Sequence, residues 1–234
     1  MAKAIGLSRA IKLEWLNKVV DLVNEGMAPE NIKEALEDYI GFEIKDETNI
    51  SKARSILMHL WVYPFSDEKA NAIRNQALEA IKNGNEDRLA MHWCMLLLSY
   101  PVFVDVTGVI GKIDRIQGSF SLSWLKSKMF EVWGERTTLY HAIDKIMQTL
   151  RQIGVAESKG GLYSVRHFEI KEDNSKLIIL KTVLALKIQA YYEPSELTSI
   201  SQMFPFHFSI DSSLLFESNQ FEFGNFGGNS VIVG

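Results

Sequence analysis

Residues 121–154 read SLSWLKSKMFEVWGERTTLYHAIDKIMQTLRQIG, and the spacing of apolar residues in this stretch predicts two helices joined by a short turn. Apolar residues recur every three or four positions in each half, so each helix presents one apolar face and the two faces are expected to share a core. Gly134 stands where the first helix ends, because glycine adopts positive φ at no steric cost. The apolar faces consist of Leu122, Leu125, Met129 and Val132 in the first helix and Leu139, Ile143, Ile146, Leu150 and Ile153 in the second.

The segments that flank this helix pair complete a small unit. Residues 102–117 carry a third apolar face and are expected to form a helix that packs across the other two. Gly108 and Gly111 within it cost about 1 kcal/mol each relative to alanine in an isolated helix, and they are expected to allow close packing instead. Gly154 is placed to end the second helix of the pair. Residues 155–165 then predict a β-hairpin with a Gly-Gly turn.

Three helices followed by a hairpin resemble the winged helix-turn-helix superfamily of prokaryotic DNA-binding proteins. The alternative is a helical hairpin and a β-hairpin buried within a larger fold. The sequence is also similar to the BrxA family of the BREX phage-defence system, through a helical N-terminal lobe, a Trp133-x-x-x-Thr137 entry and a Leu150-x-x-x-Gly154 exit. These resemblances imply a cytoplasmic, non-enzymatic accessory protein, or a transcriptional regulator, that binds duplex DNA.

The polar side of the second helix is the surface expected to contact DNA bases. It lies opposite the apolar stripe and is expected to enter the major groove, while basic residues nearby hold phosphates without reading bases. Thr137 or Thr138 is also expected to cap this helix. The expected groove contacts are Thr137, Thr138, His141, Lys145 and Gln148. The expected backbone contacts are Lys126, Lys128, Arg136, Arg151, Lys159 and Arg166.

Charge limits the strength of this binding. The chain has 25 Lys and Arg against 29 Asp and Glu, a net charge of −4, which does not fit a protein that coats nucleic acid indiscriminately. Residues 101–170 hold nine basic and seven acidic residues, so this segment alone is net positive. Asp144 and Glu135 are expected to repel phosphate, and binding is expected to be modest and sensitive to salt. The acidic total favours the alternative function, a protein-interaction or scaffold subunit.

The whole chain is expected to be mainly α (α+β), in three parts. Residues 1–100 predict a helical bundle, 101–170 the winged helix-turn-helix unit, and 171–234 a C-terminal helix with a small β-hairpin. The expected bundle helices are Ser8 to Glu25 with Ser8 as N-cap, a helix from Pro29, Ile50 to Tyr63, a helix from Ser66, and one from Glu86 to Tyr100. The expected C-terminal elements are a helix from Ser175 to Tyr192, a short helix from Glu196 to Met203 and a hairpin turning at Gly227-Gly228.

Signs of catalysis, metal binding and membrane insertion are weak. The single cysteine, Cys94, lies in an apolar run and is expected to be a buried structural thiol. The five histidines lack metal-ligand spacing, so no metal or other cofactor is expected. No apolar run approaches the length of a membrane span. The partners that the resemblance implies are double-stranded DNA, and other subunits of a defence complex or a second copy of the chain.

Overall fold

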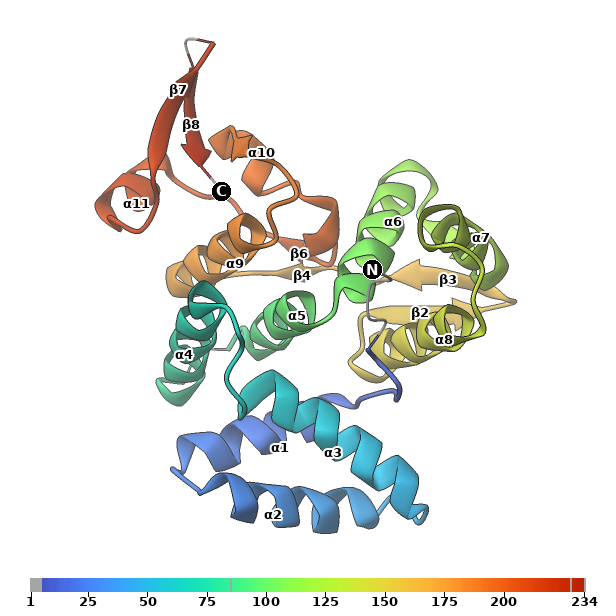
Figure 1. The fold of residues 1–234 in the computed structure, drawn as a ribbon. Helices are drawn as coiled ribbons and strands as arrows, with labels where there is room; N and C mark the ends of the chain where they lie inside the picture. Colours follow the sequence, from blue (N-terminus) through green and yellow to red (C-terminus); the bar gives the residue numbers. More distant parts are fainter. Residues whose placement is uncertain (1–5, 85, 228, 234) are drawn as a thin grey trace.

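The computed structural model describes residues 6–84, 86–227 and 229–233, and it is mainly helical with small β elements, as predicted. Three helices form the lower layer in Figure 1, where α2 packs on α3 and both contact α1. Two more, α4 and α5, pack against a helix from the C-terminal third, α9. These elements are α1 (Leu13–Asn24), α2 (Pro29–Gly41), α3 (Glu47–Trp61), α4 (Glu68–Lys82), α5 (Arg88–Ser99) and α9 (Asp173–Ala185).

Two of the predicted starts in this region are wrong, for identifiable reasons. Helix α1 begins at Leu13 rather than Ser8, because Lys12 is extended and Ile11 before it is fully buried, with its backbone N–H donating to Thr149 Oγ1 at 3.1 Å. Helix α3 begins at Glu47 rather than Ile50, because the Asp46 carboxylate accepts from the backbone N–H of Asn49 at 2.7 Å.

The central third contains the predicted helices and hairpin, with one additional strand. Short strand β1 pairs with β3 and gives a three-stranded antiparallel sheet of order β1-β3-β2. Phe120 lies opposite Tyr163 in this sheet, and their rings stack with centroids 5.9 Å apart. The elements are α6 (Pro101–Gln117), β1 (Ser119–Ser121), α7 (Leu122–Trp133), α8 (Thr137–Gln152), β2 (Ala156–Lys159) and β3 (Leu162–Val165).

Details of the turn between α7 and α8 differ from the prediction. Gly134 has the expected positive φ of 75°. The N-cap of α8 is Arg136 in an extended conformation, with no side-chain cap, so the predicted threonine cap is wrong. Val132 is 67% exposed, and the next residue, Trp133, is buried in its place, with its indole N–H donating to Asp105 Oδ2 at 2.8 Å.

The C-terminal third consists of more and shorter elements than predicted. Helix α9 ends at Ala185 because Tyr191 and Tyr192 instead pair as a strand with Val233 and Ile232. The predicted terminal hairpin is present in the described residues, and Gly227 has a positive φ of 60°, while Gly228 lies outside them. The remaining elements are β4 (Phe168–Glu169), β5 (Tyr191–Tyr192), α10 (Pro194–Leu197), η1 (Ser201–Met203), β6 (Phe206–His207), α11 (Ser212–Glu217), β7 (Phe223–Phe226) and β8 (Asn229–Val233).

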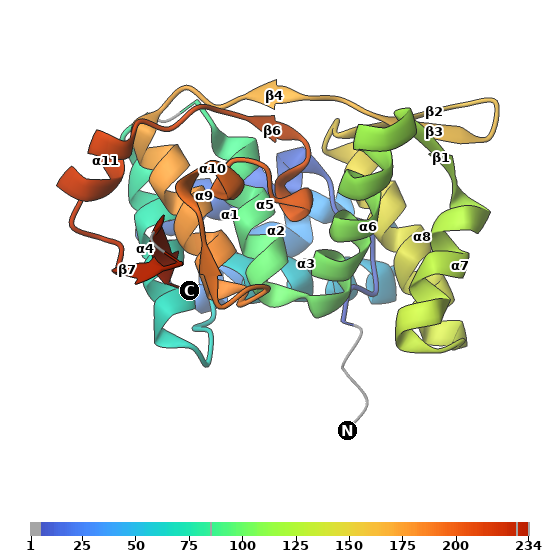
Figure 2. The same ribbon diagram turned by 90° about the horizontal axis from the view of Figure 1, so that it is seen from above.

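One hydrophobic core runs through all three parts of the chain. Helix α6 packs closely on η1, where a Cβ added to Gly111 would lie 2.8 Å from Phe204 Cβ and one added to Gly108 would lie 2.7 Å from Gln202 Nε2. The predicted role of these two glycines in close packing is therefore confirmed. Seen from above (Figure 2), α7 and α8 lie at one end of the molecule and α11 at the other.

Candidate nucleic-acid interface

Helix α8 has one buried face and one open face. Leu139, Ile143, Ile146 and Leu150 are fully buried in the core and fix the rotation of the helix about its axis. The opposite face is open to solvent among the described residues. The predicted groove residues Thr137, Thr138, His141 and Gln148 are exposed, and Lys145 is half-buried.

Lys126, predicted to contact phosphate, is buried and not exposed on this open surface. It is only 7% exposed, its ammonium lies 2.6 Å from Asp144 Oδ1, and it lies 3.2 Å from the centroid of the Tyr140 ring. The ion pair neutralises Asp144, which was expected to repel phosphate. The buried Lys126 therefore removes the repulsion that Asp144 was predicted to exert on phosphate.

Three other predicted cations at the helix pair have local partners but keep donors toward solvent. Lys128 pairs with Glu131 at 2.9 Å on the exposed side of α7. Arg136 donates through Nη2 to the Trp133 carbonyl at 2.8 Å, which orients its guanidinium at the start of α8. Lys145 donates to Gln148 Oε1 at 3.3 Å. Because each cation has several N–H donors, one such bond leaves others for a ligand.

The β2–β3 hairpin projects beside the helix pair at the end of the molecule (Figure 2). Lys159 is exposed directly before the Gly160-Gly161 turn, where both glycines have positive φ. Arg166 is exposed just after β3, with its Nε 3.7 Å from Glu157 Oε1, so this pair is weakly held in solvent. Both cations are therefore exposed to solvent on the hairpin side of the helix pair.

Tyr140 belongs to this surface and was not among the predicted contacts. Its ring is 45% exposed near the start of α8, and its hydroxyl is a hydrogen-bond donor of the kind that contacts phosphates. Helical spacing could have identified it, because Tyr140 lies three residues after Thr137 and four before Asp144 on the same face.

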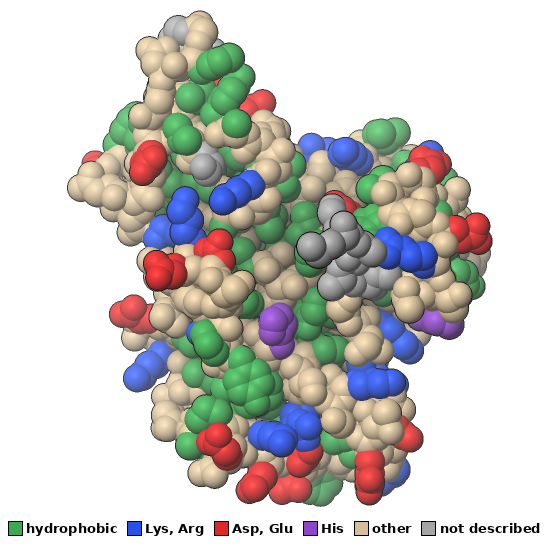
Figure 3. Space-filling model, in the orientation of Figure 1, with side chains coloured by type: hydrophobic (Ala, Val, Ile, Leu, Met, Phe, Trp, Pro, Cys, Tyr) green, Lys and Arg blue, Asp and Glu red, His purple; other side chains and the backbone are tan. Residues whose placement is uncertain are grey.

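Next to α8, a polar hollow of about 550 Å³ extends the open face toward the hairpin. Arg151 and Gln152 from the last turn of α8 line it, together with Glu157 and Ser158 of β2. Figure 3 shows Lys and Arg side chains interspersed with Asp and Glu over this half of the molecule. The surface therefore presents amide, hydroxyl, imidazole and cationic hydrogen-bond donors among both positively and negatively charged side chains.

Burial shifts the pKa values of two side chains in α5. Burial raises the pKa of the Cys94 thiol to about 12, so the thiol is protonated at neutral pH. Burial, with a smaller effect of the Arg88 charge, lowers the pKa of His92 to about 3. Within the described ranges no group of three or more His, Cys, Asp or Glu side chains is arranged to hold a metal ion, and no helix is long and apolar enough to cross a membrane.

Comparison with known proteins adds no relative. No protein-family model, curated protein or solved structure matches the chain.

Proposed function

We propose that this chain binds duplex DNA without catalysing a reaction, with α7 and α8 as a helix-turn-helix and β2–β3 as a wing. The observation that carries the proposal is the open polar face of α8, whose opposite face is locked into the core. A helix with its side chains is about 10–12 Å wide and the major groove about 12 Å, so α8 can enter the groove without rearrangement.

The side chains divide into two roles. Residues on the open face present hydroxyl, imidazole, ammonium and amide groups to base edges. Cations at the start and end of α8 and on the hairpin neutralise phosphates. In this proposal the groove contacts are Thr137, Thr138, His141, Lys145 and Gln148, and the backbone contacts are Lys128, Arg136, Tyr140, Arg151, Lys159 and Arg166.

The charge distribution supports weak, salt-dependent binding. Glu131 and Glu157 lie beside two of the proposed backbone cations, so part of the positive charge is already neutralised. If about four phosphates are neutralised, the logarithm of the association constant falls with the logarithm of salt concentration at a slope of about −3.6.

A fluorescence-anisotropy titration on a random duplex at two salt concentrations tests the proposal. The chain should bind at low salt and weaken as salt rises, and Arg136→Ala with Lys145→Ala should abolish binding. Lys33→Ala with Lys82→Ala is the matched control, because it removes the same charge from exposed sites on α2 and α4. Absence of binding at low salt, or equal loss in both double variants, would overturn it.

A second candidate function is a scaffold subunit, and it is favoured by the aromatic surface at the C-terminal end. Phe216 and Phe226 are 53% and 58% exposed, and Tyr191 packs on Phe226 with ring centroids 4.4 Å apart. In this alternative the surface joins a second copy of the chain. Analytical ultracentrifugation should then show a dimer that Phe226→Ser dissociates, and a monomer at all concentrations contradicts it.

Because the sequence is similar to the BrxA family, we propose that the chain acts as a DNA-binding accessory factor in phage defence. Regulation of transcription is the alternative process. Deletion of the gene should raise the efficiency of phage plating if the defence role holds. Unchanged plating together with altered transcript levels would instead support the regulator.

A further inference from the structure

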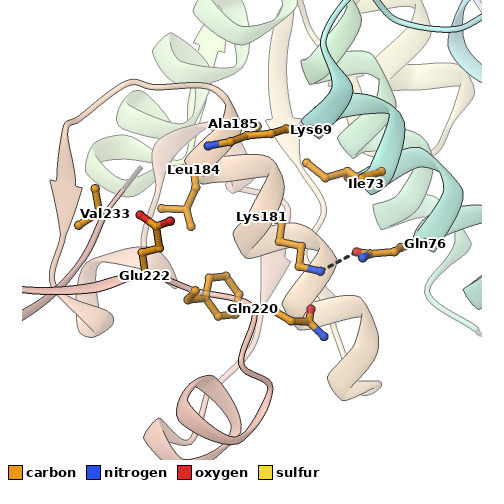
Figure 4. A pocket seen from close by; sticks show the side chains of 11 residues that line it. Lys69, Ile73, Gln76, Lys181, Leu184, Ala185, Gln220, Glu222 and Val233 are labelled. Atoms are coloured by element: carbon orange, nitrogen blue, oxygen red, sulfur yellow. Dashed lines mark hydrogen bonds between the residues drawn. The ribbon is translucent and has the colours of Figure 1, made fainter.

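A pocket of about 300 Å³ lies between α4, α9 and the C-terminal segment, far from the proposed DNA surface (Figures 1 and 4). Three parts of the chain that are distant in sequence build it. Because water occupies about 30 Å³ per molecule, this volume holds roughly ten water-sized groups. It is at the lower end of the range of small-molecule sites.

The body of the pocket is apolar. Ile73 of α4 is 4% exposed, and Leu184 and Ala185 of α9 face it from the other side. Phe221 and Val233 of the C-terminal segment complete the lining. An apolar group that entered here would lose contact with water on several sides.

Polar groups lie at two sides of this apolar body. Lys181 of α9 donates to Gln76 Oε1 of α4 at 2.7 Å, as the dashed line in Figure 4 shows. Lys69 of α4 extends away from this pair toward Leu184 and Ala185, and Glu222 of the C-terminal segment lies opposite Gln76 (Figure 4). Among the described residues, neither lysine has a carboxylate oxygen within 4.0 Å. The pocket therefore holds two cations without ion pairs and one anion.

We propose that this pocket binds a small carboxylic acid with an apolar body, its carboxylate on Lys181 and its hydrocarbon against Ile73 and Leu184. Partial burial lowers the pKa of Lys181, which indicates an ammonium that has lost part of its hydration. A bound carboxylate would replace that hydration with a charge-assisted hydrogen bond. A polyanion fits less well, because most of the lining is apolar.

Titration calorimetry with hexanoate tests the assignment on the full chain at neutral pH. Hexanoate should bind saturably at one site, with a dissociation constant of about 1 mM for a ligand this small. Hexan-1-ol should bind at least about tenfold more weakly because it lacks the charge, and hexylammonium should not bind.

Two variants test the location of the site, one by removing the charge and one by filling the pocket. Lys181→Met removes the cation and keeps the volume, so it should weaken hexanoate binding by about tenfold or more. Ala72→Phe leaves both lysines and fills the mouth from an exposed position on α4, and it should also abolish binding. Lys82→Met, outside the pocket on the same helix, should leave binding unchanged. Absence of saturable binding, equal binding of hexylammonium, or equal loss in Lys82→Met would overturn the proposal.

Discussion

The Lys126 ammonium of α7 lies 2.6 Å from Asp144 Oδ1 of α8, and the two side chains are only 9% and 25% exposed. The same ammonium lies 3.2 Å from the centroid of the Tyr140 ring, one helical turn before Asp144. One cation therefore ties α7 to two residues on the outer side of α8, while the apolar faces hold the inner side. This contact fixes the angle at which the open face of α8 is presented.

Removing the anion of this pair should cost more stability than removing the cation. Asp144→Asn leaves the Lys126 charge buried without a counter-charge, and we expect a loss of about 3 kcal/mol in the free energy of unfolding. Lys126→Met keeps the packing on Tyr140 and leaves a carboxylate that solvent can reach, so we expect about 1 kcal/mol. Urea denaturation followed by tryptophan fluorescence measures both. A smaller loss in Asp144→Asn than in Lys126→Met contradicts this account.

Burial of Lys126 also predicts how DNA binding responds to salt. Lys126→Met should leave the slope of log association constant against log salt concentration unchanged, because this ammonium does not reach a phosphate. Lys159→Met should reduce the magnitude of the slope by about 0.9, the value for one phosphate contact, because Lys159 is an exposed backbone contact in the proposal. Anisotropy titrations at several salt concentrations provide the slopes. A reduced slope in Lys126→Met would show that its ammonium leaves Asp144 for the backbone.

Gly111 should be intolerant of any side chain. A Cβ at this position would lie 2.8 Å from Phe204 Cβ and closer still to the Ser201 carbonyl oxygen, so η1 must move away from α6. We expect Gly111→Ala to lower the free energy of unfolding by about 2 kcal/mol despite its gain in helix propensity. Gly41→Ala in α2 is the control, since its Cβ would meet only Ile50 Cδ1 at 3.9 Å, and it should be neutral or stabilising. Equal stability of the two variants would count against close packing at Gly111.

Local patterns were sufficient to predict the helix pair. The buried stripe of α8 and the glycines at Gly134 and Gly154 depend only on residues within a few positions of each other, and these features agree with the structure. Strand β1 was not predicted, because a three-residue strand is too short to show a periodic pattern. The strand is defined by its pairing with β3.

Side chains whose positions depend on distant elements could not be predicted. Trp133 rather than Val132 turns inward because Asp105 of α6 accepts its indole N–H. Lys126 is buried because an acidic residue and an aromatic ring of α8 face it. Helix α1 starts only at Leu13 because Thr149 of α8 binds the backbone of Ile11. Each case is a tertiary contact over 14 or more residues that overrides a local preference.

His92 should make the protein sensitive to mild acid. Burial lowers its pKa from 6.5 to about 3, so in the folded chain it stays neutral, with Nε2 3.0 Å from Asn17 Oδ1. The unfolded chain binds a proton below pH 6.5 and the folded chain does not. The free energy of unfolding therefore falls by about 1.4 kcal/mol per pH unit as the pH drops from 6.5 toward 3.

The contribution of His92 can be isolated by substitution. His92→Gln removes the titrating group and should flatten the pH dependence of stability by about 1.4 kcal/mol per unit in this window. His141→Gln is the control, because His141 is exposed on α8. Urea denaturation at a series of pH values measures the slopes. An unchanged slope in His92→Gln would mean that His92 gains its proton without unfolding.

Cys94 should report unfolding through its reactivity. It is fully buried, and burial raises its pKa from 9.0 to about 12, so at pH 8 the folded chain holds only about 10⁻⁴ of this thiol as thiolate. We expect iodoacetamide to label it only when the core opens, with a rate that rises with urea in parallel with the unfolded fraction. The matched control is Ser158→Cys in a Cys94→Ala background, which places a thiol at an exposed position of the hairpin and should label at once without urea. Labelling of Cys94 in native buffer at the rate of that control would show that the α5 core opens without global unfolding.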